Sequence, residues 1–212
     1  MLHEVSHLTA VIDFETTGLS PTMGDRATEV AIVMMEGEQV VDRFQSLMNA
    51  GVRINAFIEA YTGITNEMIR AAPPAGRVMA DAARFVGDTP MVAHNASFDR
   101  RFWAAELDRV GMDATQPFAC TMLLSRRLYP QAPNHRLGSL VDFHRLPREG
   151  RAHRAMADAE MAAQLLLQIR RDLQSRYQVA EVRHELLMKL QACARSNVPR
   201  AIERHLAGAD AG

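Results

Sequence analysis

Cysteines are few in this sequence and long apolar runs are absent. The first shortage argues against a disulfide-stabilised or cysteine-ligated metal protein, and the second against a membrane-spanning one. The two cysteines, Cys120 and Cys193, show neither a disulfide framework nor a metal-binding spacing. No apolar run approaches the length that spans a bilayer, and residues 1–6 lack the basic start and apolar stretch of a signal peptide. We therefore expect a protein of the reducing cytoplasm.

Lysine is nearly absent, and arginine carries almost all the positive charge. Lys189 is the only lysine, and the net charge is −1. Arginines crowd one stretch of the chain, namely Arg126, Arg127, Arg136, Arg145, Arg148, Arg151 and Arg154. Arginine binds phosphate well, but a solvated arginine-rich surface would look the same, so charge alone does not predict a nucleic-acid partner.

Three common catalytic motifs are also missing. The chain has no phosphate-binding P-loop and no Gly-x-Gly-x-x-Gly, and His184-Glu185 lacks the second histidine of a zinc protease. Any chemistry must come from other residues.

Hydrophobic patterning predicts one α/β domain followed by a helical tail. The 212 residues, 48% of them hydrophobic, suffice for one full core and a short extension. A buried strand and a hairpin around Glu36-Gly37 come first, and helices then alternate with short strands, which predicts a mixed sheet between helices. The expected strands are 8–13, 27–35, 39–48, 91–93 and 118–120, and the expected helices are 76–86, 97–110 with Ser97 as its cap, 121–129, 137–143 and 158–173.

The tail begins after the last of these helices, so we divide the chain into a domain at 1–174 and an extension at 175–212. Val179, Val182, Leu186, Leu187 and Leu190 follow helical spacing. That spacing favours a helix packed on the domain, and it also permits a helix that docks onto a partner.

Two carboxylates, Asp13 and Glu15, lie two residues apart at the end of the first expected strand. Side chains two apart on a strand share a face, so these carboxylates repel each other unless a cation lies between them. Their hard oxygens suit Mg²⁺ or Mn²⁺. An Asp-x-Glu pair alone is common, however, and a solvated strand end explains it as well.

Two more acids and a histidine stand at the ends of later elements. Asp99 falls in the first turn of a helix, where the helix dipole favours a carboxylate, and Asp158 begins the long helix with His153 on the loop before it. Element ends are where α/β proteins assemble sites. Four carboxylates suit two divalent cations, which promote phosphodiester hydrolysis, and a histidine suits deprotonation of the attacking water.

The three blocks that contain these residues resemble the motifs of the DEDDh 3′–5′ exonuclease family. They are Asp13-Phe14-Glu15-Thr16-Thr17-Gly18, His94-Asn95-Ala96-Ser97-Phe98-Asp99 and His153-Arg154-Ala155-Met156-Ala157-Asp158. The likeness spans residues 8 to 173 and includes Thr62-Gly63-Ile64-Thr65. Phe57 and Thr62 depart from the family's pattern, which often has glutamate and histidine there. Within the family, the chain resembles bacterial polymerase III epsilon proofreading subunits and exonuclease X.

The resemblance implies an RNase H-like three-layer fold with a mixed central sheet of about five strands flanked by helices. It further implies that Asp13, Glu15 and Asp158 hold one Mg²⁺ or Mn²⁺ ion, that Asp13 helps to hold a second, and that Asp99 acts largely through water. His153 would accept a proton from the attacking water.

Candidate substrate-binding residues lie in and after the first two motifs. Hydroxyls and bare backbone hold a terminal nucleotide, and aromatic rings stack on any base. The candidates are Thr16, Thr17, Gly18, Leu19, Asn95, Phe98 and Phe102. Phe102 suits the core equally well, and Trp103 suits it better.

Three functions stay open. The first is release of nucleoside 5′-monophosphates from single-stranded 3′ ends of DNA, in proofreading or repair, with a polymerase subunit or a second copy bound through the C-terminal helices. The second is trimming of RNA, which motifs do not distinguish because details of the pocket read the 2′-hydroxyl. The third is an inactive interaction subunit, against which the retained acids and histidine argue.

Overall fold

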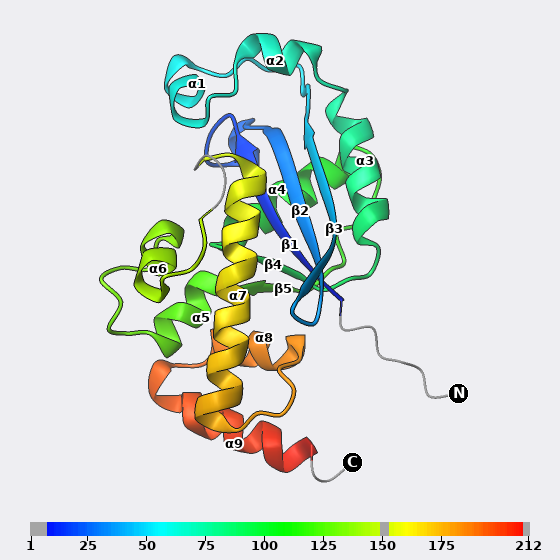
Figure 1. Cartoon of the computed structure of the whole chain (residues 1–212). Coiled ribbons are helices and arrows are strands. Elements are labelled where there is room, and N and C mark those ends of the chain that lie inside the picture. The colour runs from blue at the N-terminus through cyan, green and yellow to red at the C-terminus, as the bar shows by residue number, and fades with distance from the viewer. Residues whose placement is uncertain (1–7, 149–152, 210–212) are drawn as a thin grey trace.

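A five-stranded mixed sheet lies between two layers of helices in the computed structural model, which describes residues 8–148 and 153–209 (Figure 1). The strands are β1 (Leu8–Thr16), β2 (Ala27–Glu36), β3 (Gln39–Leu47), β4 (Met91–Ala93) and β5 (Phe118–Cys120). Their order is β3-β2-β1-β4-β5, with β1, β2 and β3 antiparallel in turn and β4 and β5 parallel to β1. The predicted α/β class and mixed sheet are confirmed.

Helices cover both faces of this sheet. The helices are α1 (Ala56–Thr62), α2 (Asn66–Ala71), α3 (Ala75–Val86), α4 (Ala96–Asp108), α5 (Thr121–Leu128), α6 (Leu137–His144), α7 (Ala155–Tyr177), α8 (His184–Ala192) and α9 (Val198–Ala209), with short 3₁₀ turns at η1 (Pro21–Met23) and η2 (Arg195–Asn197). The central helices lie close to their predicted bounds, because strong apolar periodicity marks them.

Alternate residues of β1 face opposite layers. Val11 packs with α5 and α7, whereas Ile12 and Phe14 pack with α3 and α4. Because successive side chains on a strand point to opposite faces, Asp13 and Glu15 lie on the α7 side. The strand thus carries both carboxylates toward the N-terminal end of α7.

Three expectations about the helices need correction. Helices α1 and α2 are absent from the expected set, since they are short and follow turn residues. Asn95, not Ser97, is the N-cap of α4, with a left-handed backbone at φ 70°. The long helix begins at Ala155 rather than Asp158, so Asp158 lies within its first turn.

The C-terminal helices pack against the α/β part of the molecule. Leu186, Leu187 and Leu190 of α8 are fully buried in the hydrophobic cluster that also contains α5 and α7. Arg127 on α5 donates to the carbonyls of Gln191 and Cys193 and fastens α8 from the side. Helix α7 runs past residue 174 to Tyr177 without a break. The tail therefore shares one core with the domain.

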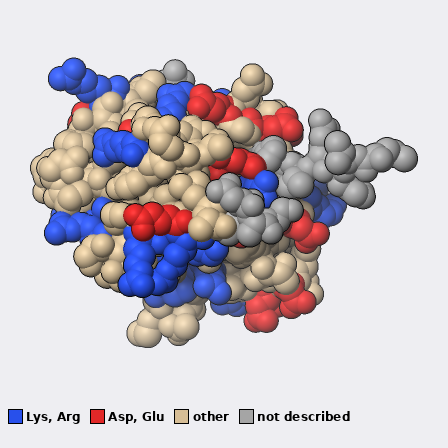
Figure 2. Space-filling view, turned by 90° about the horizontal axis from the view of Figure 1, so that it is seen from below, with Lys and Arg blue, Asp and Glu red and all other residues tan. Residues whose placement is uncertain are grey.

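The end of the molecule formed by α8 and α9 carries charges of both signs. Figure 2 shows a group of basic side chains beside a smaller acidic group there, with uncharged residues over much of the rest. Among the described residues, none of the helices combines the length and apolar character needed to cross a bilayer.

Leu187→Ala should destabilise the whole described fold, because Leu187 is fully buried in the shared core. We expect the free energy of unfolding to fall by about 2–5 kcal/mol, with one cooperative transition in urea followed by circular dichroism. Leu166→Ala on α7 is the matched control and should cost a similar amount. A separate early transition in Leu187→Ala, with the main transition unmoved, would show that the tail folds independently.

Candidate active site

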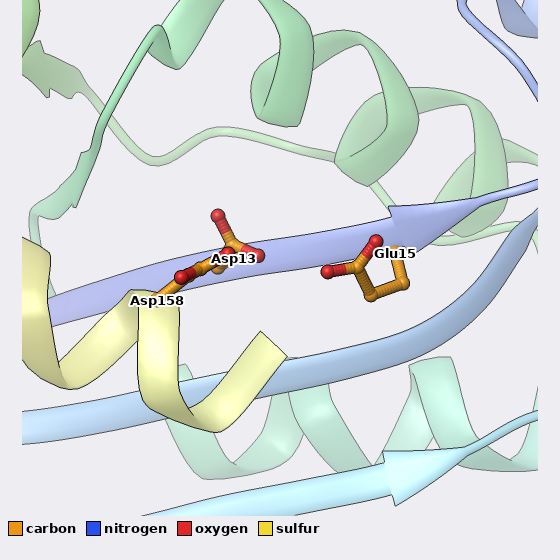
Figure 3. Close-up of side chains that lie close together, drawn as sticks. All are labelled: Asp13, Glu15 and Asp158. Atoms are coloured by element: carbon orange, nitrogen blue, oxygen red, sulfur yellow. The ribbon is translucent and has the colours of Figure 1, made fainter. Parts of the chain in front are cut away.

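Three carboxylates from two elements converge at the end of β1. Asp13 and Glu15 on β1 and Asp158 on α7 each offer an oxygen, and these oxygens all lie within 4.8 Å of one another (Figure 3). We call these three residues the carboxylate cluster. Hard, anionic oxygens at such separations fit a divalent cation of the Mg²⁺ or Mn²⁺ type.

Asp99 approaches the cluster from the opposite face of the sheet. It lies in the first turn of α4, is 2% exposed, and accepts a hydrogen bond of 3.3 Å from the backbone N–H of Phe14. Phe14 separates Asp13 from Glu15, so Asp99 is fixed beside both. After burial, the charge of Asp99 is the next largest cause that raises the pKa of Asp13.

Burial raises the pKa of every acid in this group, and repulsion from neighbouring carboxylates raises the pKa of Asp13 and Glu15 further. Burial is the largest cause in each case. The pKa of Glu15 rises to about 8, with Asp158 and Glu29 adding to the effect of burial, and that of Asp99 also rises to about 8. A cation would offset this repulsion, so the electrostatics and the donor chemistry agree.

His153 lies beside the cluster on the loop that precedes α7. Its backbone has a positive φ of 61°, which is uncommon outside glycine. Burial raises the pKa of the Asp158 carboxyl overall. The His153 ring partly offsets this effect, and so does the backbone N–H of His153, which donates a hydrogen bond to the carboxyl. The imidazole stacks on Tyr61, with ring centroids 3.9 Å apart.

Glu29 fastens the beginning of α7 to the sheet, and sequence reasoning missed it. It is fully buried on β2 and accepts two hydrogen bonds from Arg154, of 3.0 and 2.8 Å, and others from Gln45 and the N–H of Ala155. Burial alone would raise the pKa of Glu29, but these bonds outweigh it and lower the pKa. The available signal was an acid that is followed directly by six apolar residues of the same strand.

Glu106 likewise fastens α4 to the sheet, and sequence reasoning missed this residue too. It is 2% exposed and accepts two hydrogen bonds of 2.8 Å from Arg26 and one of 3.1 Å from the N–H of Ala27. These bonds join α4, which carries Asp99, to the start of β2. The available signal was an acid that helical spacing places on the same face of α4 as the buried Phe102, Trp103 and Leu107.

The turn after β1 has a defined internal structure. Thr16 donates to the carbonyl of Gly18 at 2.6 Å, and Thr17 accepts from the N–H of Arg26 at 3.0 Å. A side chain at Gly18 would collide with the Asp25 carboxyl, which accepts a hydrogen bond from the N–H of Ser20, so a substitution there must displace this carboxyl. Leu19 is 79% exposed beyond this turn.

The aromatic candidates divide between surface and core. Asn95 is exposed and Phe98 is half-buried, so both remain accessible. Phe102, by contrast, is fully buried against α3 and the sheet, and so is Trp103. The expectation that Phe102 contacts a base is therefore wrong for this structure, because α4 turns that ring into the core, whereas the expectation that Trp103 is a core residue is confirmed.

Several members of the arginine-rich stretch have internal partners. Arg154 pairs with Glu29, Arg127 holds α8, and Arg148 binds the carbonyl of Gly138 and the carboxylate of Asp142. Arg151 lies outside the described residues. Part of this charge is therefore structural.

The class of protein follows from the comparisons with known families. The model of the exonuclease family that includes RNase T matches residues 10–166. DNA polymerase III PolC-type from Bacillus cereus is 37% identical over 165 residues, which are 77% of this chain, and the Bacillus subtilis enzyme is 37% identical over 164. The chain covers 11% of the length of each of these polymerases.

Solved structures show the same fold. Exonuclease X in complex with 5′ overhanging duplex DNA superposes with a TM-score of 0.68 at 26% identity, covering 87% of this chain and 99% of that one. E. coli exonuclease I in complex with a dT13 oligonucleotide gives 0.70 at 18% identity, covering 81% and 42%. The chain belongs to the exonuclease family, and the predicted class of DEDDh 3′–5′ exonuclease with an RNase H-like fold is confirmed.

The raised pKa values predict how the stability of the metal-free protein depends on pH. Glu15 binds its proton more tightly in the folded chain, with a pKa of about 8 against an ordinary 4.5. Its contribution is therefore full below the ordinary value and is lost as pH rises through the folded value. With chelator present, the melting temperature should fall across this range.

The matched variant Asp13→Asn should show a smaller fall, because one buried charge has gone. Saturating Mg²⁺ should reduce the difference between the two proteins in this fall of the melting temperature with pH. A melting temperature of the metal-free protein that stayed level or rose across this range would contradict the repulsion.

Proposed function

We propose that this chain releases nucleoside 5′-monophosphates one at a time from single-stranded 3′ ends of DNA, with two divalent cations of the Mg²⁺ or Mn²⁺ type. The observation that carries the proposal is the convergence of Asp13, Glu15 and Asp158, with Asp99 fixed beside them. Such cations, when bound, stabilise the attacking and leaving oxygens of a phosphodiester.

The side chains around the cluster divide the work. Asp13, Glu15 and Asp158 hold the cations, and Asp99 supports them from the other side of β1. His153 accepts the proton of the attacking water, for which its imidazole must be neutral. Thr16, Thr17 and Gly18 line the turn that receives the terminal nucleotide, while Leu19, Asn95 and Phe98 offer contacts for its base and sugar.

Two relatives favour DNA as the substrate. The PolC-type proteins are named as DNA polymerases, and exonuclease X was solved with duplex DNA. The solved structure of 3′hExo bound to rAMP is 17% identical and shares the fold. Trimming of RNA is therefore the alternative that an experiment must separate.

A polymerase or a second copy of the chain would bind through exposed faces of the C-terminal helices. The apolar positions of α8, among them Leu186 and Leu187, are already buried in the core. A docking surface there must use other residues, so the tail by itself does not favour a partner over a stand-alone enzyme.

Activity should require an added divalent cation and should depend on Asp158. Chelation should abolish hydrolysis of a labelled oligonucleotide, and Asp158→Asn should lower the turnover rate about 10²-fold or more, because it weakens charge stabilisation in the transition state. Asp113→Asn, an exposed acid on another loop, is the control and should keep full turnover. Undiminished hydrolysis by Asp158→Asn, or by metal-stripped protein, would refute the mechanism.

Matched single-stranded DNA and RNA of one sequence, labelled at the 5′ end, separate the candidate functions. We expect stepwise shortening of both, with kcat/KM for DNA greater by about 10- to 100-fold, the range that rejection of an added hydroxyl provides. Faster shortening of RNA would support RNA trimming. Absence of shortening on both strands with Mg²⁺ or Mn²⁺ would favour an inactive interaction subunit.

A further inference from the structure

The ring of Tyr61 on α1 stacks against the imidazole of His153, although the residues are far apart in the sequence. Their centroids are 3.9 Å apart and their planes are inclined by 28°. We propose that Tyr61 is a positioning residue that holds the His153 ring at the edge of the carboxylate cluster. This inference rests on the proposed function, in which His153 accepts a proton.

Tyr61 lies close enough to the cluster to feel its charge. After burial, the carboxylates of Glu15 and Asp158 are the next causes that raise the pKa of its phenol. Phe57, one turn earlier on α1, also stacks with Tyr61, with ring centroids 5.9 Å apart. An aromatic column thus runs from the exposed Phe57 through Tyr61 to His153.

Helix α1 is a firm support for this column. Asn55 caps it by accepting from the N–H of Ile58, and Gly63 ends it with a left-handed backbone. Its Glu59 accepts two hydrogen bonds of 2.7 Å from Asn66, one from the backbone N–H and one from the side-chain amide. These bonds tie α1 to the beginning of α2, so the position of Tyr61 is set by its own helix.

The region beneath α1 is also closed by apolar contacts and by Thr62. Ile54, Ile64 and Ile69 form a small buried cluster, with Ile58 packed against it. Thr62 is 1% exposed, donates to the carbonyl of Ile58 and accepts from the N–H of Ile64. Thr62 is thus used inside the α1 turn, and the adjacent Tyr61 faces His153.

Two independent sets of contacts thus fix the position of His153, the proposed general base. The hydrogen bonds from Arg154 and Ala155 to Glu29 fix the backbone that follows His153. The Tyr61 ring fixes the side chain. A proton acceptor must lie within hydrogen-bond reach of its proton, and misplacement by about 1 Å is costly to the rate. The flat face of the ring, and not its hydroxyl, provides this contact.

The test compares Tyr61→Phe and Tyr61→Leu in the natural chain and in the His153→Ala background. Single-turnover rates are measured on a labelled single-stranded DNA with saturating Mn²⁺. Tyr61→Phe should keep its rate. Tyr61→Leu should lose about 3- to 10-fold in rate with little change in KM, because an aromatic contact of this kind shifts populations by that order.

In the His153→Ala background the same leucine change should cost nothing further, because interacting residues are not additive. Phe143→Leu, which alters an exposed ring on α6, is the matched control and should keep its rate. The rise in melting temperature on adding Mn²⁺ should be the same for all these proteins that fold. Tyr61→Phe keeps the aromatic ring and is the control for loss of folding in Tyr61→Leu.

The outcomes separate this inference from the function on which it rests. An equal loss in both backgrounds, or a loss in Tyr61→Phe as large as in Tyr61→Leu, would overturn the positioning role while leaving His153 as the base. Full activity of His153→Ala would overturn the assignment of the base itself, and the role of Tyr61 would fall with it.

Discussion

Repulsion among buried carboxylates is the constraint on which the rest of this structure depends. Asp13, Glu15 and Asp158 lie within 4.8 Å of one another and Asp99 is fixed behind β1. Left alone, such groups would move apart or take up protons. Two arginine–glutamate contacts prevent the elements that carry them from separating: Arg154–Glu29 binds α7 to β2, and Arg26–Glu106 binds α4 to the same strand. Each contact is well hydrogen-bonded, as a buried charge requires.

The fold therefore holds unfavourable electrostatics at the site where we propose that catalysis takes place. Groups in sparsely populated or strained states persist when their surroundings over-determine them, and such states gather at functional sites. Here the surroundings include the left-handed backbone of His153 at φ 61°, the aromatic column on α1, and the shared core of α5, α7 and α8. Cations that enter the cluster would convert the repulsion into binding energy.

Much of this was predictable from the sequence, because the main signals are local. An apolar run predicts β1, the two-residue period of a strand places Asp13 and Glu15 on one face, and the three motifs identify the family. Tertiary contacts were not predictable. Glu29 and Glu106 look like isolated acids until strands and helices are placed, and Tyr61 stands on a helix too short for a clear pattern. The prediction that Phe102 contacts substrate is wrong because the rotation of α4, invisible in the sequence, decides whether its ring faces the core.

The most direct test of the central claim is a titration of Mn²⁺ into metal-stripped protein, with free Mn²⁺ followed by electron paramagnetic resonance. The account predicts about two ions bound per chain, as a two-metal phosphodiesterase site requires, and loss of this binding in Asp13→Asn, since that carboxylate would help to hold both ions. Binding that Asp13→Asn leaves intact, or no binding by the natural chain, would contradict it.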